Sequence, residues 1–181
     1  DVEQVNLTRF ELFYPEKRPF FLEGGENYVT GMRQFYSRRI GEIPWGVKLN
    51  GKLGTWKVNS LVTASDPSTA GMPVDPGNDA LYTVFRVNKE TGNGSTIGVI
   101  GANRTYDEEN SGSLGLATSL FFTDKIGMTS QVINSWGVKN SGNWAWTINP
   151  TYRSPVTRFS IEYTDLGAGV RDKIDPIGMI Q

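Results

Sequence analysis

The chain has 181 residues, the size of a single domain, and contains neither cysteine nor histidine. These absences exclude disulfides, thiolate metal sites, a cysteine nucleophile and a Ser-His-Asp triad within the chain. The 18 basic and 19 acidic residues nearly cancel, so the charge gives no electrostatic footprint for nucleic acid.

Residues 1–41 form the least regular stretch, in which aromatic and charged side chains crowd together. The stretch follows neither the 3.6-residue period of a helix nor the two-residue period of a strand. Val5–Tyr14 and Gln34–Ile40 are candidate short strands. Between them, two prolines and the Gly24-Gly25 pair predict turns and a loop. We therefore expect an irregular entry segment that precedes the regular part of the chain.

A steady alternation begins at Trp45 and predicts about eight antiparallel strands of roughly 8–11 residues within residues 42–181. One face of each predicted strand is apolar or aromatic, and the opposite face is small, polar or charged. The predicted connections are a turn at Gly54, a long loop over 66–79, a turn over 89–94, a long loop over 104–112, a turn at 124–125, a loop over 137–142 and a turn over 153–155.

The apolar face could be the core of a soluble sandwich or the lipid-facing surface of a membrane barrel. No run of about 18 apolar residues predicts a transmembrane helix, but the strands are long enough to cross a bilayer with tilt. Alternating short and long connections are typical of outer-membrane barrels. Aromatics near strand ends suit interfacial girdles; they are Trp45, Trp136, Tyr152 and Tyr163. We therefore predict an all-β, antiparallel up-and-down transmembrane β-barrel.

In such a barrel the polar strand faces line the lumen. The predicted lumen-facing residues are Lys48, Lys52, Arg86, Arg158 and Glu162. If the short turns lie on the periplasmic side, the chain must reach the outside before its first regular strand. Either a candidate strand before Trp45 is an extra crossing, or residues 15–34 thread the lumen. We favour partial threading, because charged loop residues at membrane depth are tolerated only inside a barrel.

Two motifs of the first stretch carry a family resemblance. NLTRFELFYPEKRPFFLEG, from Asn6 to Gly24, precedes FYSRRIG, from Phe35 to Gly41, and the GKLGTW hairpin follows. Together they resemble the start of the barrel domain in a family of large bacterial outer-membrane β-barrels of unassigned function. The resemblance implies a Gram-negative outer membrane, the lipid bilayer as partner, and a chain that is part of a longer, processed protein. Asp175–Gly178 resembles a later family segment that begins a further strand.

The resemblance also implies the kind of role to expect. Precursors in that family usually carry an N-terminal carbohydrate-binding domain similar to family 9, which makes a glycan a candidate ligand. Other subunits of an outer-membrane complex are candidate partners. We expect a non-enzymatic channel, receptor or assembly component without a cofactor. The alternative is a soluble all-β carbohydrate-binding or glycoside-hydrolase-like domain.

The charged residues of the first stretch admit a structural and a catalytic interpretation. Glu16 and Glu23 could be the two carboxylates of a glycoside hydrolase, which lie roughly 5–10 Å apart. We favour a structural ion network in the lumen, because buried charges must be paired and the segment supplies both signs. Its predicted members are Arg9, Glu16, Lys17, Arg18, Glu23, Arg38 and Arg39.

Two further groups of residues have weaker functional interpretations. Oxygen-rich loops could bind calcium, but their spacing matches no EF-hand; they contain Asp66, Asp75, Asp79 and residues 107–110. A second group of aromatics could stack on sugars, although we favour lipid-facing positions for them; they are Trp136, Trp144, Trp146 and Tyr152. We therefore expect no metal site.

Overall fold

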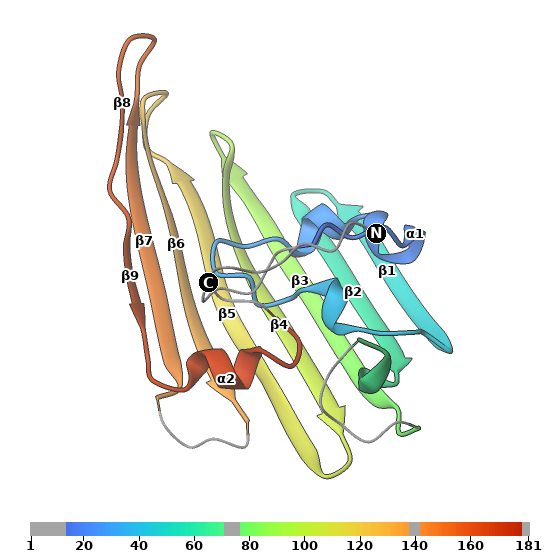
Figure 1. Ribbon diagram of the computed structural model, residues 1–181. Coiled ribbons are helices and arrows are strands. Elements are labelled where there is room, and N and C mark those ends of the chain that lie inside the picture. The colour runs from blue at the N-terminus through green and yellow to red at the C-terminus, as the bar shows by residue number, and fades with distance from the viewer. Residues whose placement is uncertain (1–13, 71–76, 138–141, 179–181) are drawn as a thin grey trace.

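The computed structural model describes residues 14–70, 77–137 and 142–178, and its main feature is one antiparallel sheet (Figure 1). The strands are β1 (Trp45–Leu53), β2 (Trp56–Ser65), β3 (Ala80–Gly92), β4 (Ser95–Tyr106), β5 (Glu109–Phe121), β6 (Ile126–Trp136), β7 (Trp144–Arg153), β8 (Arg158–Ser160) and β9 (Tyr163–Leu166). They pair in chain order, and β8 and β9 both pair with β7. The predicted all-β, antiparallel up-and-down fold is confirmed. The sheet is open, since no pairing in the described chain joins β1 to β8 or β9; closure into a barrel stays a prediction.

The turns show where the predicted boundaries hold and where they fail. Asn93 and Gly94 turn between β3 and β4 with positive φ angles of 50° and 73°, the backbone that a tight two-residue hairpin requires. A similar turn at Asp107 and Glu108 joins β4 to β5. The predicted long loop over 104–112 is therefore wrong: its polar residues lie on strands, where Tyr106 pairs with Glu109. The predicted regular alternation of short and long connections fails at this point.

The pairing register confirms the predicted alternation of side chains. We call the apolar side of the sheet the outer face, and its large side chains are exposed. Val47 is 65% exposed and Leu53 is 82% exposed, so no described part of the chain covers them. Other exposed outer-face side chains are Leu49, Val58, Leu81, Phe85, Val99, Leu114, Leu116, Val132 and Trp146.

The opposite side, which we call the inner face, is covered by two parts of the chain. Residues 14–43, the inner segment, cross it with α1 (Pro19–Leu22), η1 (Gly25–Tyr28) and η2 (Ser37–Arg39) (Figure 1). Helix α2 (Val170–Ile174) covers the β5–β6 region, while η3 (Pro67–Ala70) lies in the β2–β3 connection. The buried core is therefore between the inner face and these covering elements; it contains Phe21, Tyr28, Phe35, Ile40, Leu61, Tyr82, Val84, Ile133, Ile174 and Ile177.

Two expected strands are absent from the described residues. Gln34–Ile40 is not a strand: residues 37–39 form η2, and the Tyr36 amide donates to the Ile177 carbonyl over 2.9 Å instead of joining the sheet. Asp175–Gly178 begins no strand either, because it forms the turn after α2 that buries Ile177. The other candidate, Val5–Tyr14, lies outside the described residues except for Tyr14.

Candidate functional site

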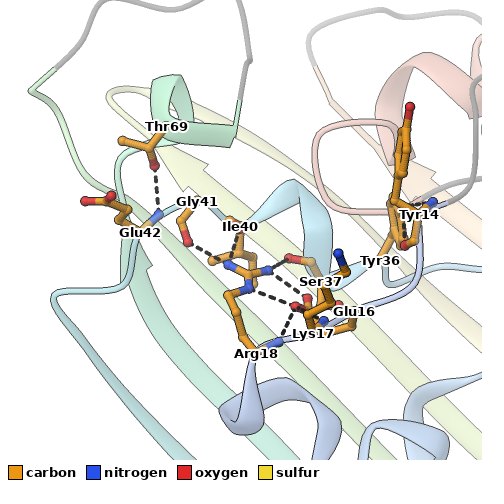
Figure 2. A network of polar contacts seen from close by, with 10 residues as sticks. All are labelled: Tyr14, Glu16, Lys17, Arg18, Tyr36, Ser37, Ile40, Gly41, Glu42 and Thr69. Carbon is orange, nitrogen blue, oxygen red and sulfur yellow. Dashed lines mark hydrogen bonds and ion pairs between the residues drawn. The ribbon is translucent and has the colours of Figure 1, made fainter. Parts of the chain in front are cut away.

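Arg18 lies at the centre of a network of polar contacts within the inner segment (Figure 2). The Arg18 Nε and one terminal nitrogen donate to both carboxylate oxygens of Glu16, over 2.9 and 2.7 Å. Its other bonds go to backbone carbonyls at Ser37 (2.8 Å), Ile40 (2.7 Å) and Gly41 (2.7 Å). The guanidinium also lies 4.4 Å from the centre of the Phe21 ring. All five N–H groups of Arg18 are therefore used to fold the inner segment on itself.

Glu16 is bound as completely as its partner. Besides the guanidinium, one carboxylate oxygen accepts from the backbone amides of Lys17 and Arg18, each over 2.9 Å. Burial alone would raise the pKa of Glu16, but the bonds from Arg18 and the neighbouring amides outweigh it and lower the pKa to about 2. Glu16 therefore stays ionised at neutral pH and cannot serve as the protonated acid of a glycosidase.

The remaining predicted network residues fall into separate pairs. Lys48 on β1 binds Glu23 over 3.0 Å, and the Glu23 side chain is 82% exposed. Arg39 binds Asp175 beyond α2 over 2.6 Å. Arg38 lines a hollow of about 510 Å³ beside Arg18, and Arg9 lies outside the described residues. Among the described residues, Arg18, Lys48 and Arg39 therefore bind three different carboxylates, and no second carboxylate is seen to bind Glu16.

Two of the predicted lumen-facing residues lie under the inner segment. Lys48 donates to the carbonyls of Phe20 (2.9 Å) and Glu23 (2.7 Å), and Arg86 on β3 donates to the carbonyl of Val29. Both side chains thereby bind the backbone of the segment, whose carbonyls have no strand partner. Cations of the sheet hold the segment in place.

The other three predicted lumen-facing residues lie on exposed parts of the molecule. Lys52 binds the carboxylate of Glu90 over 3.1 Å near the β1–β2 turn. Arg158 faces Arg153 as its partner across β7 and β8. The Glu162 carboxylate accepts from Asn149 over 3.4 Å.

A buried amide network joins the inner segment to the middle of the sheet. Gln131 on β6 accepts from the Met32 amide over 2.8 Å and donates to the Met32 carbonyl over 3.0 Å. It also donates to Gln34 over 2.9 Å, and Gln34 donates to Ser113 on β5 over 2.9 Å. Gln34 is fully buried and Gln131 is 2% exposed. Sequence reasoning missed this network, although Gln131, a glutamine on the same face of β6 as Gly127 and Thr129, was a usable signal for one of its members.

Among the described residues, three buried side chains have polar atoms without hydrogen-bond partners: Asn59, Arg104 and Tyr28. Arg104 on β4 is 6% exposed, and neither its Nε nor one terminal nitrogen has an acceptor. Its guanidinium lies 4.9 Å from the centre of the Tyr106 ring. The Tyr28 hydroxyl is also unpartnered, and burial raises the pKa of Tyr28 to about 12, so this hydroxyl keeps its proton. Tyr28 lines a cavity of about 210 Å³ within the inner segment.

The described residues of the possible calcium site and of the possible sugar-stacking group do not come together in one site. Within the described part of the chain, no group of three or more acidic side chains could hold a metal ion. Asp66 instead accepts from the amides of Ser68 and Gly77, over 2.9 and 2.8 Å. The predicted sugar-stacking aromatics are spread along the outer face; Trp146 stacks on Tyr163 with ring centres 5.0 Å apart. None of the helices in the described residues is long and apolar enough to span a membrane.

Comparison with known proteins gives one match. No curated protein and no solved structure matches the chain. One family model matches residues 1–102, which comprise the inner segment, strands β1–β3 and most of β4. That span is more than half of the 181 residues and contains the Arg18 site. The chain therefore belongs to the family described as a domain of unknown function, DUF5916.

Proposed function

We propose that the chain forms part of the wall and lumen of an outer-membrane β-barrel, which acts as a non-enzymatic channel, receptor or assembly component. The observation that carries the proposal is the contrast between the two faces of one sheet. The outer face exposes a continuous field of large apolar side chains, and the inner face is polar and covered by the chain's own segments. An apolar surface of this extent needs a cover, and lipid is the cover that a barrel wall has.

The lengths of the strands support a position across a bilayer. β1 to β7 have between 9 and 13 residues each. A strand that crosses the hydrocarbon layer with tilt needs about 9–11 residues.

Aromatic side chains mark the ends of these strands. Trp45 begins β1, Trp56 begins β2, Trp136 ends β6 and Trp144 begins β7. All four lie on the outer face and are exposed. Indole rings at both margins of an apolar band match the interfacial girdles of membrane barrels.

Charged side chains are almost excluded from the outer face. The pairing register leaves only Lys89 and Asp165 there among the strand residues. Lys89 lies near the β3–β4 turn with its ammonium 5.2 Å from the centre of the Trp56 ring. A lysine beside an interfacial tryptophan can extend its charge to the headgroups. The charge pattern therefore fits lipid in the middle of the band and water at its margins.

The unpaired edges of the sheet indicate how a barrel wall would be completed. In the described residues, β1 and the β8–β9 edge pair on one side only. Unpaired strand edges require partners in a membrane, so further strands or other subunits would complete the wall. A glycan is a secondary candidate ligand, since only the resemblance to barrels with a carbohydrate-binding companion domain supports it.

Membrane extraction tests the proposal. The protein, expressed from its complete gene, should stay with the membranes during alkaline carbonate washing and dissolve in detergent. It should then migrate differently on gels before and after boiling, because a folded barrel resists the denaturing detergent. Release of intact protein into the soluble fraction, with cooperative unfolding in plain buffer, would instead favour a soluble all-β carbohydrate-binding domain.

A further inference from the structure

We infer that the inner face forms an anion-selecting surface, so that the barrel admits small solutes that carry carboxylate or phosphate groups. This inference rests on the proposed function and names the class of solute. It comes from the sign of the charges on the inner face, which the net charge of −1 for the whole chain conceals.

The register assigns strand charges to the inner face with a strong excess of one sign. Its acidic strand residues are Glu90 and Glu109, and Glu162, between β8 and β9, binds Asn149 of the same face. Its basic strand residues are Lys48, Lys52, Lys57, Arg86, Arg104, Arg153 and Arg158. Seven cations against three carboxylates leave four positive charges on this face.

The covering elements do not neutralise this excess. The inner segment has five basic residues and four acidic ones, and α2 with Asp175 has two of each. Many of the remaining carboxylates lie in the connections between strands, such as Asp66, Asp79 and Asp124. The inner face and its described covering elements together therefore keep a net positive charge.

Four of the seven cations are already bound within the molecule. Lys48 and Arg86 hold carbonyls of the inner segment. Lys52 and Lys57 share the carboxylate of Glu90, each over 3.1 Å. The remaining three are arginines, which cannot lose their charge by deprotonation.

The three remaining arginines lack carboxylate partners in the described residues. Arg153 and Arg158 are exposed and directly opposite each other on β7 and β8, where like charges repel. Arg104 is 6% exposed, and its guanidinium bonds to Tyr82 and lies over the Tyr106 ring, which leaves two donor nitrogens without an acceptor in the described residues. A dissolved anion would relieve the repulsion between the exposed Arg153 and Arg158, and a lumen lined with such arginines would concentrate anions.

Ion selectivity provides the test. The protein from the complete gene is inserted into planar lipid bilayers, and the reversal potential is measured across a potassium chloride gradient. We expect chloride to permeate more readily than potassium. The double variant Arg153→Gln/Arg158→Gln should lower the chloride-to-potassium permeability ratio by roughly twofold or more. Lys89→Gln removes one charge from the outer face and should leave the ratio unchanged.

Gel mobility of the same samples distinguishes a failure of the anion inference from a failure of the proposed barrel. A heat-modifiable, inserted protein that prefers potassium, passes no ions, or keeps its ratio in the double variant would overturn the anion inference and leave the proposed barrel intact. A protein that neither inserts nor shows the mobility change would overturn the proposed function itself, and the anion inference with it.

Discussion

The outer and inner faces of the sheet share the same strands but solve different physical problems. On the outer face, large apolar side chains lie exposed, so their effect on stability depends on whether water or lipid surrounds the sheet. On the inner face, small and polar side chains leave room for a segment of backbone, which they hold by specific bonds. The side chains of the outer face therefore suit a surrounding solvent, whereas those of the inner face fit one part of the same chain, the inner segment. The effect of an inner-face substitution on stability should therefore depend on which hydrogen-bonding atoms it removes.

The largest expected effect comes from Arg18→Ala. The change leaves the Glu16 carboxylate without its counter-ion and three carbonyls without a donor. We expect the free energy of unfolding to fall by about 3 kcal/mol, because the pair is only partly buried but three carbonyls lose their donor with it. Arg18→Lys should recover little, because an ammonium cannot reproduce the planar fork. Urea unfolding of the detergent-solubilised protein measures the change, with exposed Arg171→Ala as the control; similar values for both would refute the account of Arg18.

A second inner-face change is Gln131→Leu, which removes the partner of Met32 and Gln34. Buried groups left without partners cost about 1–3 kcal/mol each, so we expect a loss of about 2–3 kcal/mol. The inner segment should also become sensitive to limited proteolysis before the strands do. Gln131→Glu keeps the acceptor for the Met32 amide, so its stability should lie between those of the wild type and the leucine variant. Unchanged protease resistance in the leucine variant would contradict the proposed anchoring.

Acid should weaken the Arg18 site in a defined pH range. Folding lowers the pKa of Glu16 from its ordinary value of 4.5 to about 2. The unfolded chain therefore binds a proton first as pH falls. The stabilisation is fully present above about pH 4.5 and is lost on the way down to about pH 2, with a size of about 2 kcal/mol after solvent screening. Unfolding measured at stepwise pH should show a larger loss in the wild type than in Arg18→Ala, where the backbone amides of residues 17 and 18 still bind the carboxylate; an identical slope in both would count against the site.

The smallest effect compares two glycines from the two faces. A Cβ at Gly115 on the inner face would press on the Gln34 side chain, whereas a Cβ at Gly51 on the outer face meets nothing within 4 Å. Gly115→Ala should destabilise by about 1–2 kcal/mol through displacement of Gln34. Gly51→Ala should change stability by less than about 0.5 kcal/mol. Equal effects in thermal unfolding would show that the inner face is not closely fitted to the segment.

The two faces of the strands were predictable because they depend on short-range alternation. From Trp45 onward, residues two apart share chemistry, and the pairing of Val47 with Val62 joins two positions predicted to be apolar. The turn at Asp107 and Glu108 was not predicted, since hydrophilic residues at the end of a strand look the same in sequence as a loop.

The inner-face contacts could be predicted only in part. Glu16 and Arg18 were both expected in one ion network, but their direct pairing was not. The carbonyl acceptors of Arg18 were not expected either, since main-chain oxygens leave no trace in a sequence. The bond between Gln131 and Gln34 joins residues 97 positions apart, and nothing local to either glutamine indicates the other. Contacts of this kind depend on the way the whole segment crosses the sheet.

The most direct test of the central claim places the same charge on each face of one strand. Val132 on the outer face and Thr129 on the inner face of β6 are both exposed. If lipid covers the outer face, Val132→Arg should lower stability in the membrane by about 2–4 kcal/mol and reduce the heat-modifiable fraction, while Thr129→Arg should be nearly neutral. Equal tolerance of both arginines, or a Val132→Arg protein that folds better in plain buffer, would contradict the assignment of the outer face to lipid.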